Sequence, residues 1–477
     1  MEGRVMNIPE SIRRQERLRI VLSEYGKPVE SPAIGQVTVS DDGFVSWEQL
    51  GFDKSPLIDN DYELIENLWN DKTKIKIVEI TETVNRKRQN GLHIRANSHV
   101  GHVAFDTFDL VILPKFDNLA EVSTEKNPSL ATLLAYAFNL NDLKVVGEQL
   151  SPTAHFAEIL IRWLLNEIHS IQRRGVFQQY RRERRDLPII RGKIDIKTWM
   201  RRGCIPSERM PCVFSRRSVD NILNQTLCAG LRRCVAIAGS DSLKNECRRL
   251  ADNFALFVSD RTLDYRMLAE ARRGLNRLNA HYENAVRIIK LLYTGSGGFV
   301  LGDTLKTQTR IPGFFFDMNH LFEMVVWRFL HNNLPRPEYK VICQKEYEVF
   351  FDEQRKLPVI KPDIIISKGE EQFVFDTKYK DIEDKDGEVA SADLYQLSIY
   401  ALTCSRHLEA SKHRAGIIYP AENGVKRWKI ILRQSQLVGE DDLCTITLHP
   451  IVLEKLAEAI DKKEGERKDF ALGIIGL

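Results

Sequence analysis

The chain has 477 residues, 43% of them hydrophobic and 28% charged, with a formal net charge of +3 at pH 7. This length predicts about two to four domains, and the apolar share is ample for packed cores. No apolar run approaches the roughly 18 residues of a membrane-spanning helix, and the charged N-terminus lacks the apolar core of a signal peptide. These features exclude membrane and secreted classes, and we expect a soluble cytoplasmic protein.

Spacing of residues excludes several kinds of site. The eight cysteines show no C-x-x-C pair and no regular framework, so we expect neither zinc nor disulfides. No segment matches G-x-x-x-x-G-K-[ST], the phosphate-binding loop of many nucleotide hydrolases. We therefore expect that this chain binds no nucleotide itself.

Residues 1–150 are predicted to form a β-rich domain. Short strands separated by Gly, Asn and Asp turns are expected at 35–40, 75–82, 91–95 and 104–113. A basic loop tip at 83–91 carries Arg86, Lys87 and Arg88. It is either a solvated turn or a contact for DNA or for a partner protein.

Residues 151–300 are predicted to be mainly helical. Helices are expected at 152–171, at 220–231 with Asp220 as N-cap, and at 267–293, followed by a glycine-rich linker at 295–298. Asn224 and Gln225 are interpreted as ordinary polar positions. The apolar run Pro188-Ile189-Ile190 suits a strand, and Gly192 permits a close backbone approach.

The same region is strongly basic. Residues 171–240 hold sixteen Lys/Arg against five Asp/Glu, an excess typical of contact with a polyanion. We predict DNA as that polyanion, because phosphate neutralisation supplies most non-specific affinity. Pairing with acidic residues or with an acidic partner protein is the alternative. The predicted DNA-binding residues are Arg181, Arg182, Arg184, Arg185, Arg191 and Lys193.

Residues 301–477 are predicted to form an α/β domain with a mixed sheet. The expected order is a helix at 317–332, strands at 347–351, 359–366 and 372–379, a helix at 393–403 and a strand at 415–420. With the two preceding regions, this order predicts a multidomain α+β protein.

A hairpin in this region carries the candidate chemistry. A turn centred between Gly369 and Glu370 places Asp363 opposite Asp376, with Cβ atoms about 5 Å apart. Two carboxylates at that distance suit Mg²⁺, and the Thr377 carbonyl could add a ligand. Lys378 lies on the same strand face as Asp376, where it can act on the attacking water or on the phosphate charge. A surface hairpin with an Asp–Lys ion pair is the alternative, although the apolar residues on both strand faces indicate burial.

Two helices supply further candidates. Glu323 falls in an apolar row of the helix at 317–332, where a carboxylate is costly unless a metal or its water pairs with it. Gln396 and Tyr400 are four residues apart and share one face of the helix at 393–403. A solvated amphipathic helix explains that spacing equally well.

These residues resemble the PD-(D/E)xK nuclease superfamily: Glu323, Pro362-Asp363, Asp376-Thr377-Lys378 and Gln396-x-x-x-Tyr400. More narrowly, the chain resembles the McrC family, the nuclease subunit of the McrBC methylcytosine-specific restriction system. The further blocks that carry this resemblance are 100–116 (VGHVAFDTFDLVILPKF), 189–196 (IIRGKIDI) and 314–327 (FFFDMNHLFEMVVW).

The resemblance implies a PD-(D/E)xK core in residues 301–477 that cleaves DNA with Mg²⁺. It implies Asp363, Asp376 and Glu323 as metal ligands, and Lys378, Gln396 and Tyr400 as the other catalytic residues. It also implies that the N-terminal region docks on an McrB-like hexameric AAA+ GTPase and stimulates it. Two alternatives stay open: a non-catalytic regulatory subunit of that GTPase, and a sequence-specific restriction enzyme of the same architecture.

Overall fold

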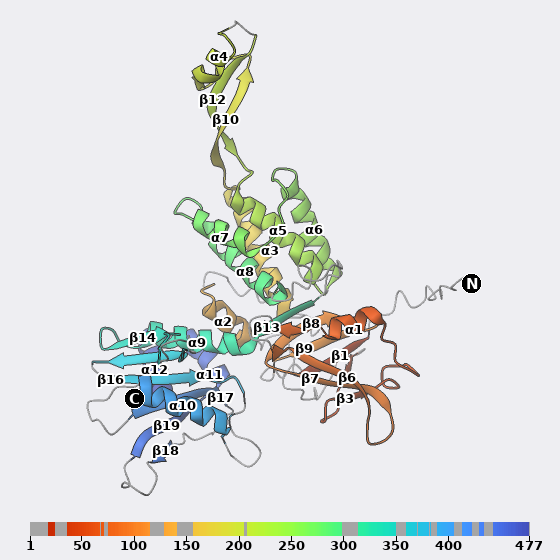
Figure 1. Ribbon diagram of the computed structural model, residues 1–477, viewed down its shortest axis with the longest axis vertical. Coiled ribbons are helices and arrows are strands. Elements are labelled where there is room, and N and C mark those ends of the chain that lie inside the picture. Colours follow the sequence, from red (N-terminus) through yellow and green to blue (C-terminus); the bar gives the residue numbers. More distant parts are fainter. Residues whose placement is uncertain are drawn as a thin grey trace, which may run out of the picture. The chain divides into compact units, whose positions relative to one another are not determined.

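The architecture comes from a computed structural model of the whole chain (Figure 1). The part that the structure describes comprises residues 18–23, 36–66, 68–70, 75–114, 128–140, 156–204, 208–297, 313–349, 359–369, 371–380, 382, 389–404, 413–421, 429–433 and 442–476. The chain divides into two compact units. The first unit consists of residues 1–153 and 315–477, and the second consists of residues 154–314. No helix in the described ranges is long and apolar enough to cross a membrane.

The N-terminal part of the first unit is rich in strands, as predicted. One sheet has the order β13-β8-β9-β1-β2 and another the order β3-β7-β6. The bounds are β1 Arg19–Ser23, β2 Gln36–Thr38, β3 Phe44–Ser46, β6 Val78–Val84, β7 Asn90–Ala96, β8 His99–Ala104, β9 Asp109–Leu113 and β13 Gly313–Asp317. Helix α1 (Asp59–Glu66) and a short ladder of β4 (Trp69–Asn70) with β5 (Ile75–Lys76) complete this part.

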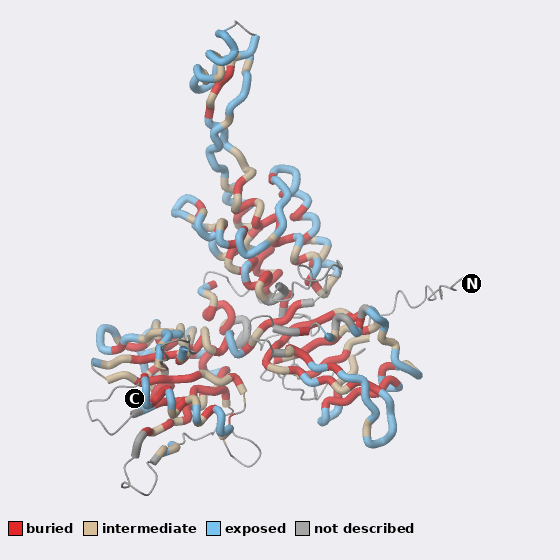
Figure 2. The backbone as a smooth tube through the Cα atoms, in the orientation of Figure 1, coloured by how far each residue is buried: buried red, intermediate tan, exposed pale blue. Residues whose placement is uncertain are grey.

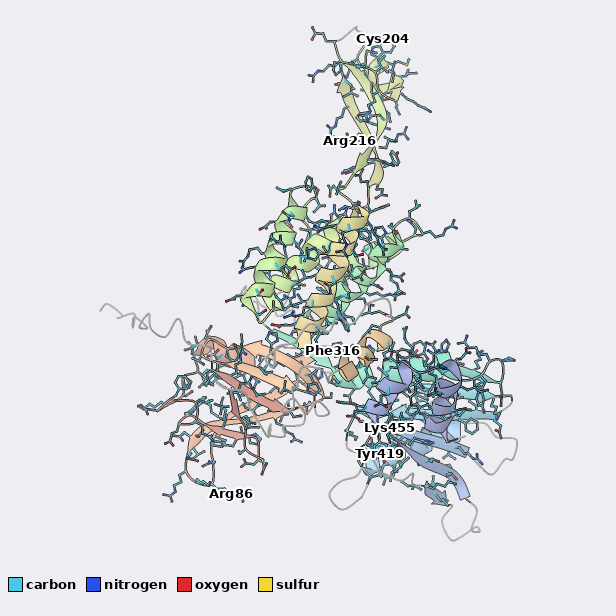
Figure 3. The ribbon with its side chains drawn as sticks, turned by 180° about the vertical axis from the view of Figure 1, so that it is seen from behind. Arg86, Cys204, Arg216, Phe316, Tyr419 and Lys455 are labelled. Atoms are coloured by element: carbon cyan, nitrogen blue, oxygen red, sulfur yellow. The ribbon has the colours of Figure 1, made fainter. Side chains whose placement is uncertain are left out.

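The single strand predicted at 104–113 is wrong, because the chain turns there. β8 and β9 form an antiparallel pair joined by a tight turn, in which Phe105 N donates to Phe108 O at 2.9 Å. The buried carboxylate of Asp61 stabilises this turn by accepting from Asp106 N at 2.9 Å. The basic tip at 83–91 does form a hairpin turn between β6 and β7, with Arg86 exposed at its end (Figure 3).

The second unit contains a group of packed helices. They are α3 Phe156–Arg174, α5 Ile222–Ile237, α6 Asp241–Ala255, α7 Tyr265–Gly274 and α8 Glu283–Gly297. α5 packs against α6 and α8, and α3 packs against α8. Leu160, Leu164 and Ile168 of α3 are fully buried. The single helix predicted at 267–293 is wrong. Residues 275–282 separate α7 from α8, and only a 3-10 turn, Ala280–Tyr282, forms between them.

The strongly basic segment is a β-structure. β10 (Gln179–Leu187) and β12 (Met210–Ser218) form a long antiparallel ribbon, with β11 (Lys193–Ile194) paired to β12 and a short helix α4 (Ile196–Arg201) at its end. We call residues 179–218 the arm; it extends away from the helices and is mostly exposed (Figures 1 and 2). The predicted strand at Pro188-Ile189-Ile190 is wrong, because Ile189 and Ile190 are 81% and 54% exposed and lie in the bend after β10.

The base of the arm is held by a buried hydrogen-bond network. Asn224 is fully buried in the first turns of α5, and its Nδ2 donates to the carbonyls of Phe177 and Val219 at 3.0 and 2.6 Å. Tyr282 donates to Asn224 Oδ1 and accepts from Phe177 N, both at 2.8 Å. Burial raises the pKa of Tyr282 to about 12, so it stays a neutral hydrogen-bonding group. Asn224 is therefore not the ordinary polar position that was predicted.

The helix after the arm also starts one residue later than predicted. Asn221, rather than Asp220, is the N-cap of α5, because its side chain accepts from Leu223 N and Asn224 N. The Asp220 carboxylate instead accepts from Ser259 N and Oγ at 2.9 and 2.6 Å.

The C-terminal part of the first unit contains a six-stranded mixed sheet, which confirms the predicted sheet type. Its order is β14-β15-β16-β17-β19-β18, with β16, β17 and β19 parallel and the other pairs antiparallel. The bounds are β14 Tyr339–Cys343, β15 Ile364–Lys368, β16 Glu371–Thr377, β17 His413–Pro420, β18 Lys429–Arg433 and β19 Asp442–Ile451. The strand predicted at 347–351 is wrong as placed. Tyr347 forms only an isolated bridge to Ile360, and residues 350–351 lie outside the described ranges.

Helices pack on this sheet as their periodicity predicted. The helix predicted at 317–332 is α9 (Met318–Asn333), whose N-cap Asp317 accepts from Asn319 N. The helix predicted at 393–403 is α10 (Ser391–Cys404), which buries Leu397 and Ala401 against Ile417. Helices α2 (Pro128–Ala137), α11 (Leu453–Ile460) and α12 (Glu464–Ile475) complete this part, with α2 packed on α9 and α11, and α12 packed on α9.

Candidate active site

The hairpin register predicted from the sequence is confirmed. β15 and β16 pair with Ile364 opposite Phe375 and Lys368 opposite Glu371. Continuing that register by one residue places Asp363 beside Asp376, at the end of the ladder. The strands that deliver them are buried on both faces: Ile364, Ile365, Ile366 and Val374 are fully buried. This burial excludes a solvated surface hairpin.

Asp363 is positioned by the strand that follows. Its Oδ2 accepts from both the backbone N and the Oγ1 of Thr377, each at 2.8 Å. Burial and the neighbouring carboxylates of Asp376 and Glu323 nevertheless raise the pKa of Asp363 to about 7. A carboxylate held among other carboxylates at the edge of a core is a favourable place for a cation.

Lys378 is the cation beside Asp376. Its Nζ lies 2.8 Å from Asp376 Oδ2 and donates to Gln396 Oε1 at 3.0 Å. Burial opposes the charge of Lys378, but Asp376 and Asp393 outweigh it, and its pKa lies above its ordinary value. Burial raises the pKa of Asp376, which is 3% exposed, while Lys378 lowers it.

The predicted face of α10 contacts this lysine. Gln396 Nε2 donates to the hydroxyl oxygen of Tyr400 at 2.8 Å, so that Tyr400, Gln396 and Lys378 form one hydrogen-bonded chain ending at Asp376. A solvated amphipathic face for this helix is excluded, because Tyr400 is 7% exposed and packs against Val374.

Glu323 is brought to the same place from α9. Its side chain is 13% exposed, and its Oε1 accepts from Gln344 Nε2. Gln344, which follows β14, also donates its backbone N to Asp363 O at 2.9 Å and has a positive φ of 48°. Sequence reasoning missed Gln344, since nothing in its local pattern marks a bend that joins two carboxylate-bearing segments.

A further carboxylate, Asp393, was also missed. It lies in the first turn of α10, is 6% exposed and is 2.6 Å from Lys380 Nζ through its Oδ2. Its Oδ1 is 3.7 Å from Lys378 Nζ. The spacing of Asp393 and Gln396, three residues apart on a helix, could have indicated a shared face.

The donors fit a hard divalent ion that keeps part of its water shell. Within the described residues, no three or more His, Cys, Asp or Glu side chains are close enough to form a complete metal cluster by themselves. Asp363 Oδ2 and Asp376 Oδ2 are engaged by Thr377 and Lys378, and the second oxygen of each makes no hydrogen bond or ion pair with the described residues. Two carboxylate oxygens with several waters is the donor set that Mg²⁺ usually accepts from proteins.

The predicted DNA-binding residues all lie on the arm, but they are not on one surface. Strand alternation places Arg182 and Arg184 on one face of β10 and Arg181 and Arg185 on the other. Arg185 Nε is 3.1 Å from Glu183, and the Arg191 guanidinium lies 5.0 Å above the Phe214 ring. Lys193 in β11 pairs with Val213 in β12. The arm as a whole has twelve Lys/Arg against four Asp/Glu, which makes both faces positive.

The arm also exposes apolar side chains. Ile189, Ile190, Ile196 and Met200 are each more than half exposed and lie around α4 and the preceding bend. Tyr180 is 66% exposed and is stacked by Arg217 at 5.4 Å. A surface that combines cations with exposed aliphatic groups suits a macromolecular contact.

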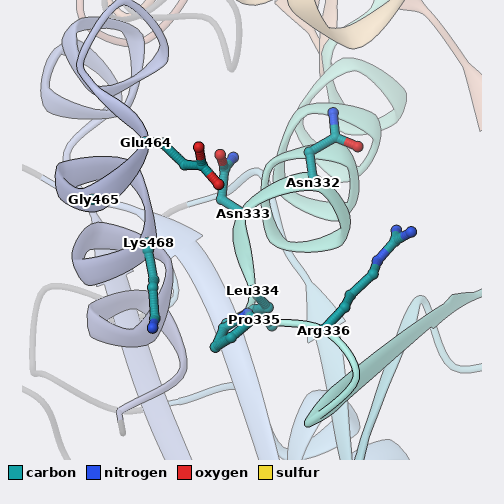
Figure 4. Close-up of a pocket in the computed structure, with 8 residues that line it drawn as sticks. All are labelled: Asn332, Asn333, Leu334, Pro335, Arg336, Glu464, Gly465 and Lys468. Atoms are coloured by element: carbon teal, nitrogen blue, oxygen red, sulfur yellow. The ribbon is translucent and has the colours of Figure 1, made fainter.

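An open pocket of about 750 Å³ lies elsewhere, between the end of α9 and the first turn of α12 (Figure 4). Asn332, Arg336 and Lys468 are among the residues that line it. None of the predicted catalytic residues lines this pocket, so it does not belong to the carboxylate site.

Comparison with known proteins identifies the family. The family model described as "McrBC 5-methylcytosine restriction system component" matches residues 94–420, which is more than half of the chain. The chain belongs to this McrBC family. No curated protein sequence matches it.

Two solved structures from Thermococcus gammatolerans are similar to this McrBC family member. One is described as a refined half-complex from the tetradecameric assembly of McrB AAA+ hexamers with bound McrC. The likeness there has a TM-score of 0.57 and 19% identity, and covers 96% of this chain and 99% of that chain. The other is the McrBC complex, with a TM-score of 0.46, 20% identity, and coverage of 67% and 88%. At 19% identity the first likeness shows the fold.

Membership in the McrBC family agrees with the resemblance that the sequence motifs carried. The matched span includes the arm, the β15–β16 hairpin and α10. It therefore contains all of the residues proposed for catalysis: Glu323, Asp363, Asp376, Lys378, Gln396 and Tyr400.

Proposed function

We propose that this chain is the nuclease subunit of an McrBC-like restriction system that acts on modified cytosine. In this proposal residues 301–477 contain a PD-(D/E)xK core that hydrolyses DNA phosphodiesters with Mg²⁺. The observation that supports it most is the meeting of Asp363, Asp376 and Lys378 at one end of a buried hairpin. Glu323 reaches the same end from α9 and raises the pKa of both aspartates.

Each residue has a role that follows from its contacts. Asp363 and Asp376 would hold Mg²⁺ with one oxygen each, and Glu323 would bind the ion or one of its waters. The ion, when bound, supplies Lewis acidity and a water of lowered pKa. Thr377 fixes the Asp363 carboxylate through two hydrogen bonds. Gln344 orients Glu323 in the same way.

Lys378 stabilises the negative charge that grows on the phosphate in the transition state. It suits this role because its pKa is raised, so that it carries a full positive charge at neutral pH. Gln396 fixes the ammonium beside Asp376, and Tyr400 in turn fixes Gln396. The two α10 residues are therefore positioning residues for Lys378.

We further propose an McrB-like AAA+ GTPase hexamer as the partner. The structurally similar chain is from an assembly described as McrB hexamers with bound McrC, and its likeness extends over 96% of this chain. In this proposal the N-terminal region docks on the GTPase and stimulates it. DNA recognition would then be divided between the two proteins.

The deciding experiment uses the full chain together with an McrB-like AAA+ GTPase. We expect Asp376→Ala to abolish Mg²⁺-dependent cleavage of methylated DNA in the presence of GTP and to leave the stimulation of GTP hydrolysis intact. Glu338→Gln is the matched control, because Glu338 forms a carboxylate–lysine pair with Lys368 at the far end of the same hairpin. Undiminished cleavage by Asp376→Ala would reject the nuclease assignment and favour the regulatory subunit.

The arm has two candidate partners, DNA and a protein. Its charge favours DNA, whereas its exposed apolar residues around α4 favour a protein partner. We expect a combined change of Arg181, Arg182, Arg184 and Arg185 to Ala to weaken DNA binding and to reduce its dependence on salt. An unchanged salt dependence together with weaker GTPase stimulation would assign these arginines to the partner protein instead.

The control for that experiment removes the same charge from the same unit. Arg248, Arg249, Arg272 and Arg273 are exposed on α6 and α7. Their combined change to Ala should leave DNA binding and its salt dependence near the values of the unchanged protein.

A further inference from the structure

Two buried carboxylates, Asp376 and Asp393, and two lysines, Lys378 and Lys380, lie beside the hairpin end, and each lysine is closest to a different carboxylate. Asp376 Oδ2 pairs with Lys378 at 2.8 Å, and Asp393 Oδ2 pairs with Lys380 at 2.6 Å. Asp393 Oδ1 is 3.7 Å from Lys378, well beyond its distance to Lys380. Each lysine therefore has its own carboxylate.

Burial makes this pairing important. Asp376 is 3% and Asp393 6% exposed, so neither carboxylate is screened well by water. Lys380 follows Lys378 by two residues, which brings a second ammonium to the same end of the strand. If Asp393 lost its charge, Asp376 would be a nearby buried carboxylate available to attract Lys380. A second lysine on Asp376 would compete with a metal ion for its remaining oxygen.

We propose that Asp393 is a positioning residue that holds Lys380 away from Asp376. This inference rests on the proposed nuclease function, because it concerns the metal-binding capacity of that site. Asp393 is well placed for the role, since α10 fixes it rigidly: it lies one turn before Gln396, which contacts Lys378. The helix thus holds both lysines, Lys380 through Asp393 and Lys378 through Gln396.

Three variants of the full chain test the proposal. Asp393→Asn keeps the side-chain shape and removes the charge, and we expect about a 10- to 100-fold loss in cleavage rate at limiting Mg²⁺. We expect a similar weakening of Mn²⁺ binding, measured by electron paramagnetic resonance without DNA. Lys380→Gln alone should stay near the unchanged protein. The double variant Asp393→Asn/Lys380→Gln should recover most of both losses, because it removes the competing ammonium.

Recovery in the double variant separates positioning from a general effect on folding. A double variant as impaired as Asp393→Asn would overturn the proposal, as would a strong loss in Lys380→Gln alone. The Glu338→Gln control removes an exposed carboxylate–lysine pair, with Glu338 3.0 Å from Lys368, and should change neither quantity.

Acylation of the lysines gives a readout that does not depend on nuclease activity. We expect acetic anhydride to modify Lys380 faster in Asp393→Asn/Asp376→Asn, in which neither carboxylate can pair with it, than in the unchanged protein; peptide mass spectrometry measures the rate. Unchanged reactivity of Lys380 would contradict the pairing itself. If Asp376→Ala proved harmless to cleavage while Lys380 reactivity rose as expected, the nuclease assignment would fail and the pairing would stand.

Discussion

Asp363→Asn is expected to stabilise the metal-free protein above neutral pH, although it removes a proposed metal ligand. The pKa of Asp363 is raised from 3.8 to about 7, mainly by burial. The folded state therefore binds this proton more tightly than the unfolded state does. Stability contributed by this group is full below the ordinary pKa and is lost as pH rises through about 7.

The expected gain in stability is the cost of the charged, buried Asp363 carboxylate minus the loss in its hydrogen bonds from Thr377. A rise of about 3 pKa units corresponds to roughly 4 kcal/mol of destabilisation above pH 7. Thr377 donates two hydrogen bonds to the carboxylate, and a neutral amide oxygen would weaken each by about 1 kcal/mol. We therefore expect a net gain of about 2 kcal/mol for Asp363→Asn at pH 8.

Hydrogen exchange of the hairpin measures this gain locally. A chain of two compact units need not unfold in one step, so global melting is less informative. In EDTA at pH 8, amides of β15 and β16 should exchange about 30-fold more slowly in Asp363→Asn than in the unchanged protein. The difference should shrink toward pH 5. A variant with faster exchange at pH 8, or with a gain that does not depend on pH, would refute this view of Asp363.

Three other expectations follow from described contacts. Mg²⁺ at about 100 times its dissociation constant should stabilise the unchanged protein by about 2.7 kcal/mol in the same exchange measurement, and Asp376→Asn should lose most of that gain. Tyr282→Phe leaves Phe177 N and Asn224 Oδ1 without their hydrogen bonds to the Tyr282 hydroxyl, which costs about 1–3 kcal/mol for each group. A fluorophore on Cys204, the only exposed one of the eight cysteines, should then move more freely and show a lower anisotropy. Unchanged anisotropy would contradict the view that this network holds the arm. Gly192→Ala should weaken the pairing of β11 with β12, because the new Cβ would lie 2.5 Å from Val213 O and the backbone has a φ of +72°. Gly175→Ala is the control for backbone strain alone, because Gly175 also has a positive φ but its Cβ would meet no neighbouring atom.

The hairpin and the flanking helices could be predicted because their signals are local. Turn chemistry at Gly369 set the register that places Asp363 beside Asp376, and apolar spacing marked α9 and α10. Nearest-neighbour patterns of this kind need no knowledge of the rest of the chain.

Residues that act across the sheet could not be found in that way. Gln344 owes its position to a contact with Glu323, 21 residues earlier, and a lone polar residue carries no pattern. Asp393 shares a helix face with Gln396, but only the folded chain shows that this face meets Lys378 and Lys380. The arm was missed for a different reason. Gln179–Leu187 is exposed on both faces, so it lacks the alternation of apolar and polar residues by which strands are recognised.

The strand β13 affects how this protein folds during synthesis and which of its fragments stay soluble. Gly313–Asp317 is an edge strand of the sheet that otherwise uses residues 19–113, and it pairs with β8. A ribosome must therefore synthesise the entire second unit before that sheet can be completed. Expression of the first 150 residues alone would leave the β8 edge uncovered, which invites aggregation. Fusing residues 313–317 to such a fragment should restore its solubility.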